Sequence, residues 1–217
     1  PRRKRPDTVK VDPRCREGRT LEDFKVFMAE NPDTPVVELD SVEGTKGGTV
    51  MLTITFVTDG LQLAVRREHN DSKSVTDLFR RLYLELGPNT FSDLFPVLLA
   101  DNGSEFSDPK SIEFDANGNR RTWLFYCNAS APYQKGSCEV RHEMIRRIIP
   151  KGVDITPYSQ VQIDTMMSHI NSYRRKTLGN KSPYEMFAYQ YGEDILKKFG
   201  LRKIPPDEII LSPKLFN

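Results

Sequence analysis

The sequence predicts an α/β fold in which a mixed five-stranded sheet is flanked by helices. Two observations indicate it. Segments with the two-residue alternation of strands come first, and a segment with the 3.6-residue period of a helix, short apolar runs and further helices follow. A meander of strands that precedes the helices is typical of a mixed sheet, whereas a doubly wound parallel sheet alternates strands and helices from the start.

The first three elements read as an antiparallel meander. Residues 36–40 run from apolar to acidic, and residues 49–57 alternate between apolar and polar. Asp59-Gly60 is a hairpin signal, after which residues 62–68 can return as a third strand.

A helix and a buried strand are expected next. Apolar residues at the helical period from Val75 to Leu86 predict an amphipathic helix that ends at Gly87-Pro88. Residues 95–100 form a short apolar run, and Asp101 follows it directly. Since open α/β sheets bind ligands at the carboxyl ends of their strands, Asp101 lies where a site is expected.

The second half is expected to begin with a hairpin or strand and to continue with helices. The turn-rich residues 115–119 separate 111–114 from the apolar run 121–126, in which Trp123 is expected to be buried. An apolar stripe predicts a helix from Gly136 to Pro150 with Glu139 in its first turn. Helices are also expected over residues 159–173 and from Ser182 onward, where a capping box precedes a proline. This order matches a ribonuclease-H-like sheet.

Charge and composition limit the functional classes. The net charge is only +2, but the first 20 residues carry a basic excess that could follow a phosphate backbone or form a solvated linker. The three cysteines lack paired metal spacing, so reduced thiols are expected. No apolar run has the length of a membrane span and no signal peptide is visible, so we expect a cytoplasmic protein without membrane contact.

Three carboxylates stand at element ends that such a sheet brings together: Asp40, Asp101 and Glu139. Oxygen ligands suit Mg²⁺ or Mn²⁺, and carboxylates gathered in one cleft repel one another unless a cation neutralises them. Two ions could activate a water or a 3′-hydroxyl and stabilise the leaving oxygen. Four other acids near the proposed cleft remain alternatives: Glu38, Glu43, Glu105 and Glu143. The pattern alone does not exclude Glu38 in place of Asp40.

Four ordered motifs resemble the transposases of the insertion sequence thirty family. They are Asp101 to Phe106 (DNGSEF), Pro132 to Gly136 with Glu139, Ile145-Arg146 through Gly152, and Asn171 to Leu178 (NSYRRKTL) with Lys181 to Pro183 and Glu185. The family's catalytic core is similar to retroviral integrases and has the ribonuclease-H-like fold. The resemblance implies that Asp40, Asp101 and Glu139 form a triad that binds two Mg²⁺ or Mn²⁺ ions. This sequence departs from the family's usual residues at Leu39, Cys138 and Val140, none of which is a ligand.

The resemblance also implies the partners and the domains. The expected partner is DNA, both the terminal inverted repeats of an element and the target, and a homo-oligomer is expected on DNA. We expect a basic linker or arm at residues 1–33, an integrase catalytic domain at 34–200 and a tail at 201–217. The chain begins at Pro1 without an initiator Met, so it is expected to be part of a longer protein. The family's helix-turn-helix portion, which recognises element ends, is absent, so this chain alone is expected to lack sequence-specific binding.

Basic side chains near the triad are candidates for DNA binding, with a structural or solvated role as the alternative for each: Lys135, His142, Arg146, Lys151, Arg174 and Arg175. Asn102-Gly103 is expected to form a tight turn in which glycine supplies a positive φ. The function predicted is metal-dependent DNA cleavage and strand transfer. A nuclease of the same fold and an inactive DNA-binding protein remain the alternatives.

Overall fold

The computed structural model describes residues 12–128 and 136–216, and between 136 and 141 it describes the backbone alone. The strands are β1 (Val36–Glu43), β2 (Val50–Phe56), β3 (Gln62–Arg67), β4 (Val97–Ala100) and β5 (Trp123–Tyr126). The helices are α1 (Leu21–Glu30), α2 (Ser72–Leu86), α3 (Pro88–Leu94), α4 (Pro109–Glu113), α5 (Gly136–Ile148), α6 (Gln160–Ser172), α7 (Pro183–Tyr191) and α8 (Glu193–Lys198). The expected α/β fold is confirmed.

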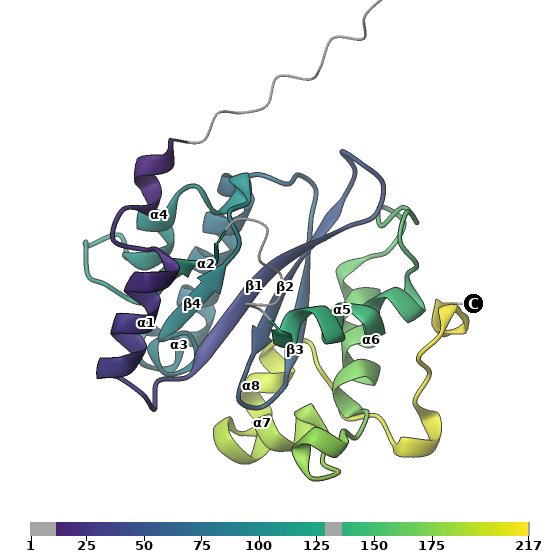
Figure 1. Ribbon diagram of the computed structural model, residues 1–217. Helices are drawn as coiled ribbons and strands as arrows, with labels where there is room; N and C mark the ends of the chain where they lie inside the picture. The colour runs from purple at the N-terminus through teal and green to yellow at the C-terminus, as the bar shows by residue number, and fades with distance from the viewer. Residues whose placement is uncertain (1–11, 129–135, 217) are drawn as a thin grey trace, which may run out of the picture.

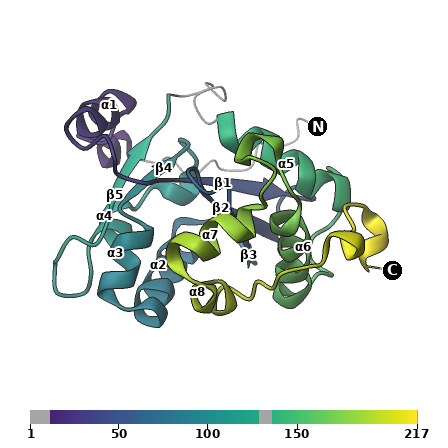
Figure 2. The same ribbon diagram turned by 90° about the horizontal axis from the view of Figure 1, so that it is seen from below.

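The five strands form one mixed sheet in the order β3-β2-β1-β4-β5 (Figure 1). β1, β2 and β3 pair antiparallel, as the meander predicts, and β4 and β5 then add in parallel to the β1 edge. Figure 2 shows α1 and α5 on one side of the strands and α2 and α3 on the other. The main core therefore lies between the sheet and the helices that follow the meander, and includes the rings of Phe79, Phe91 and Phe95.

The parallel pairing of β1 and β4 sets the level of their carboxyl ends. Val36 pairs with Val97 and Glu38 with Leu99, an offset of 61 residues. Asp101 lies the same 61 residues after Asp40, so continuing the register places the two acids abreast. The backbone pairing of β1 with β4 thus sets the relative positions of the two acids that are expected to form the site.

Polar side chains occupy the outer edge of β3. Asn171 accepts a hydrogen bond from the amide of Gln62 (3.0 Å) and donates one to its carbonyl (2.7 Å). The amide of Gln160 repeats the pattern, accepting from Arg66 N (2.7 Å) and donating to Ala64 O (2.9 Å). Because a bare strand edge invites pairing with other chains, these two α6 residues protect the sheet.

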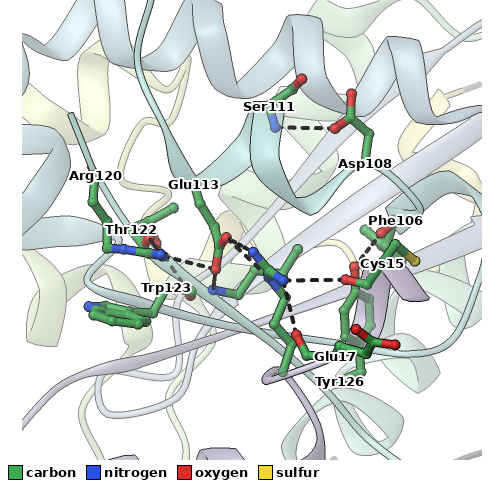
Figure 3. A network of polar contacts seen from close by, with 12 residues as sticks. Cys15, Glu17, Phe106, Asp108, Ser111, Glu113, Arg120, Thr122, Trp123 and Tyr126 are labelled. Atoms are coloured by element: carbon green, nitrogen blue, oxygen red, sulfur yellow. Dashed lines mark hydrogen bonds and ion pairs between the residues drawn. The ribbon is translucent and has the colours of Figure 1, made fainter. Parts of the chain in front are cut away.

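The outer edge of β5 is occupied by a buried carboxylate and a carbonyl. Glu113, 1% exposed, accepts from Leu124 N (3.1 Å), from Arg120 Nη1 (3.1 Å) and from Arg19 Nη2 (2.5 Å), as Figure 3 shows. The carbonyl of Arg19 accepts from Tyr126 N (2.8 Å). The carboxylate therefore neutralises two guanidinium groups while it ends the sheet.

The described part of the basic arm packs on this edge. Phe24 and Phe27 of α1 contact the ring of Phe125 at 5.7 and 5.6 Å between centroids. The C-terminal residues also pack, since Leu201 and Ile204 are buried. The boundaries at 33/34 and 200/201 remain predictions.

The expectation of a hairpin or strand within residues 111–126 is met by the strand β5. Residues 111–113 instead end α4, because Pro109 and the Asp108 cap favour a helical turn, and Phe114 forms a bridge with Arg120. The expected burial of Trp123 was wrong. Trp123 is 41% exposed, because it lies on the outer strand β5. Phe27 and Arg120, whose guanidinium lies 3.9 Å from the ring centre, cover the ring only in part. α3 and α8 are short helices that the sequence did not predict.

The C-terminal residues run along α6 and bond to its side chains. Ser168 Oγ accepts from Arg202 N (3.1 Å), and Ser172 Oγ accepts from Ile204 N (2.9 Å). His169 Nδ1 accepts from Ile210 N at 3.1 Å. None of the helices within the described ranges is long and apolar enough to cross a membrane.

Replacing Glu113 with glutamine should destabilise the fold by about 2–4 kcal/mol, because the guanidinium groups of Arg19 and Arg120, which pack against this buried carboxylate, lose their counter-charge. Urea unfolding measures the change. The control is Glu22→Gln, whose ion pair with Lys25 is exposed and should contribute less than about 1 kcal/mol. Equal stability of the two variants would contradict the structural role of Glu113.

Attachment of the C-terminal residues should weaken at acidic pH. Burial, and then the charge of Arg202, lower the pKa of His169, while Glu208 raises it. The neutral ring is thus favoured in the folded state, and its contribution is present above about pH 6.5 and declines as the pH falls below that value. Hydrogen exchange at Ile210, corrected for the intrinsic rate, should accelerate at pH 5.5. His169→Asn, which keeps an acceptor that does not titrate, should remove this dependence.

Candidate active site

Asp40 lies in the second half of β1, which continues to Glu43. The preceding Leu39 is fully buried, whereas Asp40 is half-buried. Its Oδ1 accepts a hydrogen bond from Ser41 N (2.8 Å), and its carbonyl accepts one from Thr53 Oγ1 (3.2 Å) on β2. The strand and its neighbour therefore fix both the backbone and the side chain of this acid.

Asp101 follows the last residue of β4 and is held by the next turn. Its Oδ1 accepts from Gly103 N at 2.9 Å. Gly103 has φ −59°, so the expected positive φ is wrong. Glycine is required here by space, because a Cβ would lie 2.3 Å from Glu105 Oε2 and 2.9 Å from Asp101 Oδ1.

Glu139 lies in the first turn of α5, and its side chain lies outside the described residues. The position of α5 is defined by a contact of His142, which lies one helical turn after Glu139. His142 Nε2 lies 2.9 Å from Thr53 Oγ1, and since that hydroxyl donates to the Asp40 carbonyl, it can accept from the ring. This contact places α5 over the strand pair that carries Asp40.

The alternative acids have other surroundings. Glu38 is 6% exposed and lies deeper on β1, opposite Thr55. Glu43, beyond Asp40, accepts from Asn70 Nδ2 (3.1 Å), and Glu143 forms an exposed ion pair with Arg147. None of these three acids lies level with Asp40 and Asp101 in the register of β1 and β4.

Glu105 has a structural role that the sequence did not indicate. It is 5% exposed and accepts a hydrogen bond from Ser41 Oγ (2.7 Å), which in turn accepts from Arg67 Nη2 (3.0 Å). Burial lowers the pKa of Arg67, and the charge of Glu105 opposes that shift. Glu105 therefore links the residue after Asp40 to the turn after Asp101.

The predicted DNA-binding residues are dispersed around this edge. Arg146 Nη2 donates to the carbonyl of Glu43 (2.8 Å), and burial lowers the pKa of Arg146. Arg175 Nη1 lies 3.4 Å from the Gly60 carbonyl, which favours a structural role. Lys151 and Arg174 are exposed, and Lys135 lies outside the described residues.

The described side chains include no group of three or more His, Cys, Asp or Glu placed to hold a metal ion. Two of the three predicted ligands, Asp40 and Asp101, are at the same edge, and the third is on a helix that packs there. Carboxylates of this kind suit hard divalent cations.

No protein-family model matches the chain. Over 149 residues it is 29% identical to the transposase InsI of insertion sequence element IS30A from Escherichia coli, covering 69% of this chain and 37% of that protein. It is 35% identical over 92 residues to the IS1086 transposase of Cupriavidus metallidurans, covering 42% and 26%. ORF3 of Spiroplasma virus SpV1-R8A2 B, named as an integrase, is 28% identical over 170 residues, covering 77% and 51%. The chain spans about half or less of each relative.

Solved structures agree on the fold. The catalytic core domain of BIV integrase aligns with a TM-score of 0.51 and 15% identity, over 75% of this chain and 99% of that one. A chain of the simian T-cell lymphotropic virus intasome, solved with a PP2A regulatory subunit, aligns with a TM-score of 0.54 and 12% identity, over 70% and 54%. The chain is therefore similar to transposases of insertion sequences such as IS30A, and its fold is that of retroviral integrase catalytic cores.

Proposed function

We propose that this chain is the catalytic core of a DNA transposase that cleaves element ends and joins them to target DNA. The observation that carries the proposal is the register of β1 and β4, which brings Asp40 level with Asp101 at one edge of the sheet. The homology to insertion-sequence transposases supports DNA as the substrate. The activity of the longer protein is part of the same proposal.

Asp40, Asp101 and Glu139 are proposed to hold two Mg²⁺ or Mn²⁺ ions. When bound, such a pair would supply activation of the attacking oxygen and stabilisation of the leaving oxygen in an in-line displacement. Within the described residues, Asp101 Oδ2 has no hydrogen bond, while Oδ1 is fixed by Gly103 N, so the carboxylate is oriented with one oxygen left for a ligand. This division suits an acid whose geometry must be fixed before substrate arrives.

The remaining residues would orient DNA and the ligands. His142, held by Thr53, would fix the helix that carries Glu139. Arg146 bonds through Nη2 to Glu43, and within the described residues its Nη1 is buried without a partner. We assign that Nη1 to a DNA phosphate, and give Lys135, Lys151 and Arg174 the weaker role of a positive track, while Arg175 keeps the structural role that its contact with Gly60 favours.

The expected assembly is a homo-oligomer on DNA, in the cytoplasm of a bacterial cell. Joining two element ends to one target requires that two sites act together. The solved relative in an intasome supports this assembly. Sedimentation with paired-end DNA that finds only monomers would contradict it.

Asp101→Asn should abolish Mg²⁺-dependent nicking and joining of DNA that carries the element's ends. An amide is a neutral and weaker ligand, and the loss of about 4 kcal/mol of transition-state stabilisation corresponds to roughly a thousandfold in rate. Asp93→Asn, at an exposed position on α3, is the matched control and should retain activity. Nicking without joining would favour a nuclease, and DNA binding indifferent to metal and mutation would favour an inactive binding protein.

A second comparison separates Asp40 from Glu38 on the same strand. Asp40→Asn should lose activity on the scale of Asp101→Asn while its unfolding midpoint changes little. Glu38→Gln should lower the unfolding midpoint and keep activity within about tenfold of wild type, because Glu38 is buried on β1 two residues before Asp40. The reverse outcome would move the first metal ligand to Glu38.

A further inference from the structure

The basic N-terminal residues reach the turn that carries Asp101. A single turn of 3₁₀ helix, Pro13–Arg16, is capped by Asp12 and leads into Arg19, which Glu113 anchors. Arg16 Nη2 donates to the carbonyl of Asn102 at 2.8 Å, and its guanidinium lies 5.6 Å from the centre of the Tyr126 ring. These contacts join a segment expected to be an arm to the candidate active site.

The carbonyl that Arg16 contacts belongs to the same peptide group as the amide that holds Asp101. Asn102 C=O accepts from Arg16, and Gly103 N–H donates to Asp101 Oδ1 at 2.9 Å. Hydrogen bonds in a chain polarise one another, so a cation on the carbonyl strengthens the N–H as a donor. The guanidinium thereby acts on the carboxylate through one peptide group.

The other side of this peptide group is fixed by the sheet. Asn102 Nδ2 donates to the carbonyl of Cys127 (2.7 Å), just beyond β5. Gly103 has no room for a side chain, so the turn is closely packed against Glu105. The peptide can therefore keep a single orientation only while both Arg16 and Asn102 hold it.

We propose that Arg16 is a positioning residue that orients Asp101 for metal binding through the Asn102–Gly103 peptide group. The proposal rests on the proposed function and extends it, because it makes the N-terminal basic segment part of the active site. Arg16 needs no contact with DNA or metal for this role. Its removal should loosen the turn and raise the Mg²⁺ concentration that the reaction requires.

The test compares Arg16→Ala, Arg16→Lys and Arg14→Ala in the whole 217-residue chain. Arg14 lies in the same 3₁₀ helix with its side chain 82% exposed, so its variant removes an equal charge without touching the turn. In Arg16→Ala, amide hydrogen exchange over residues 101–106 should accelerate about tenfold, the scale of one lost charge-assisted hydrogen bond. Arg16→Lys should recover part of the protection, and Arg14→Ala should match wild type.

Activity supplies the second readout. Arg16→Ala should raise the Mg²⁺ concentration for half-maximal nicking several-fold, and DNA binding without metal should fall no more than in Arg14→Ala. Gly103→Ala, which displaces Asp101 directly, should give the same metal dependence with the Arg16 contact intact.

Unchanged exchange at 101–106 in Arg16→Ala, or equal acceleration in Arg14→Ala, would overturn the proposal. Equal acceleration across α1 would also overturn it, since the whole segment would then have detached. Exchange requires no catalysis, so a wild-type chain without metal-dependent nicking contradicts the proposed function and leaves this test valid.

Discussion

The parallel pairing of β1 with β4 is the constraint on which the candidate site depends. It aligns two strands that are far apart in sequence, and the same offset that pairs Val36 with Val97 sets Asp40 beside Asp101. A shift of one residue would turn one of the acids to the opposite face. The buried residues of both strands, Leu39 and Leu98 among them, hold that register because each must face the core. The register that buries these residues in the core is thus the same register that aligns the two acids of the candidate site.

Both edges of the sheet are closed by polar groups from other elements. On β3 the side-chain amides of Gln160 and Asn171 replace a neighbouring strand, and on β5 the Glu113 carboxylate and the Arg19 carbonyl do so. Unpaired strand edges promote association between chains. The side chains that occupy both edges therefore keep the sheet from pairing with strands of other chains. Asn171, the first residue of the motif Asn171 to Leu178, thus has a structural role at the edge of β3.

The N-terminal basic segment is packed on the catalytic fold. Arg19 is anchored in a buried carboxylate, and Arg16 ends at the turn after Asp101. Phe24 and Phe27 add an apolar contact on the face of β5. A segment that precedes the fold in sequence therefore closes one side of the site in space.

The sequence by itself determined the meander of three strands, the helix that follows it, the strand that ends just before Asp101, and the helix of Glu139, because periodicity, turn residues and local caps are local signals. It did not determine that β1 continues beyond Asp40 to Glu43, or that α3 and α8 form. Only the tertiary structure decided that Glu105 and Arg16 support those acids, that Gly103 is required by space, and that Trp123 is partly exposed. These properties arise where elements distant in sequence meet. The sequence pattern of one strand or helix does not specify which atoms of other elements pack against it. Burial and hydrogen bonding between elements therefore follow only from the fold.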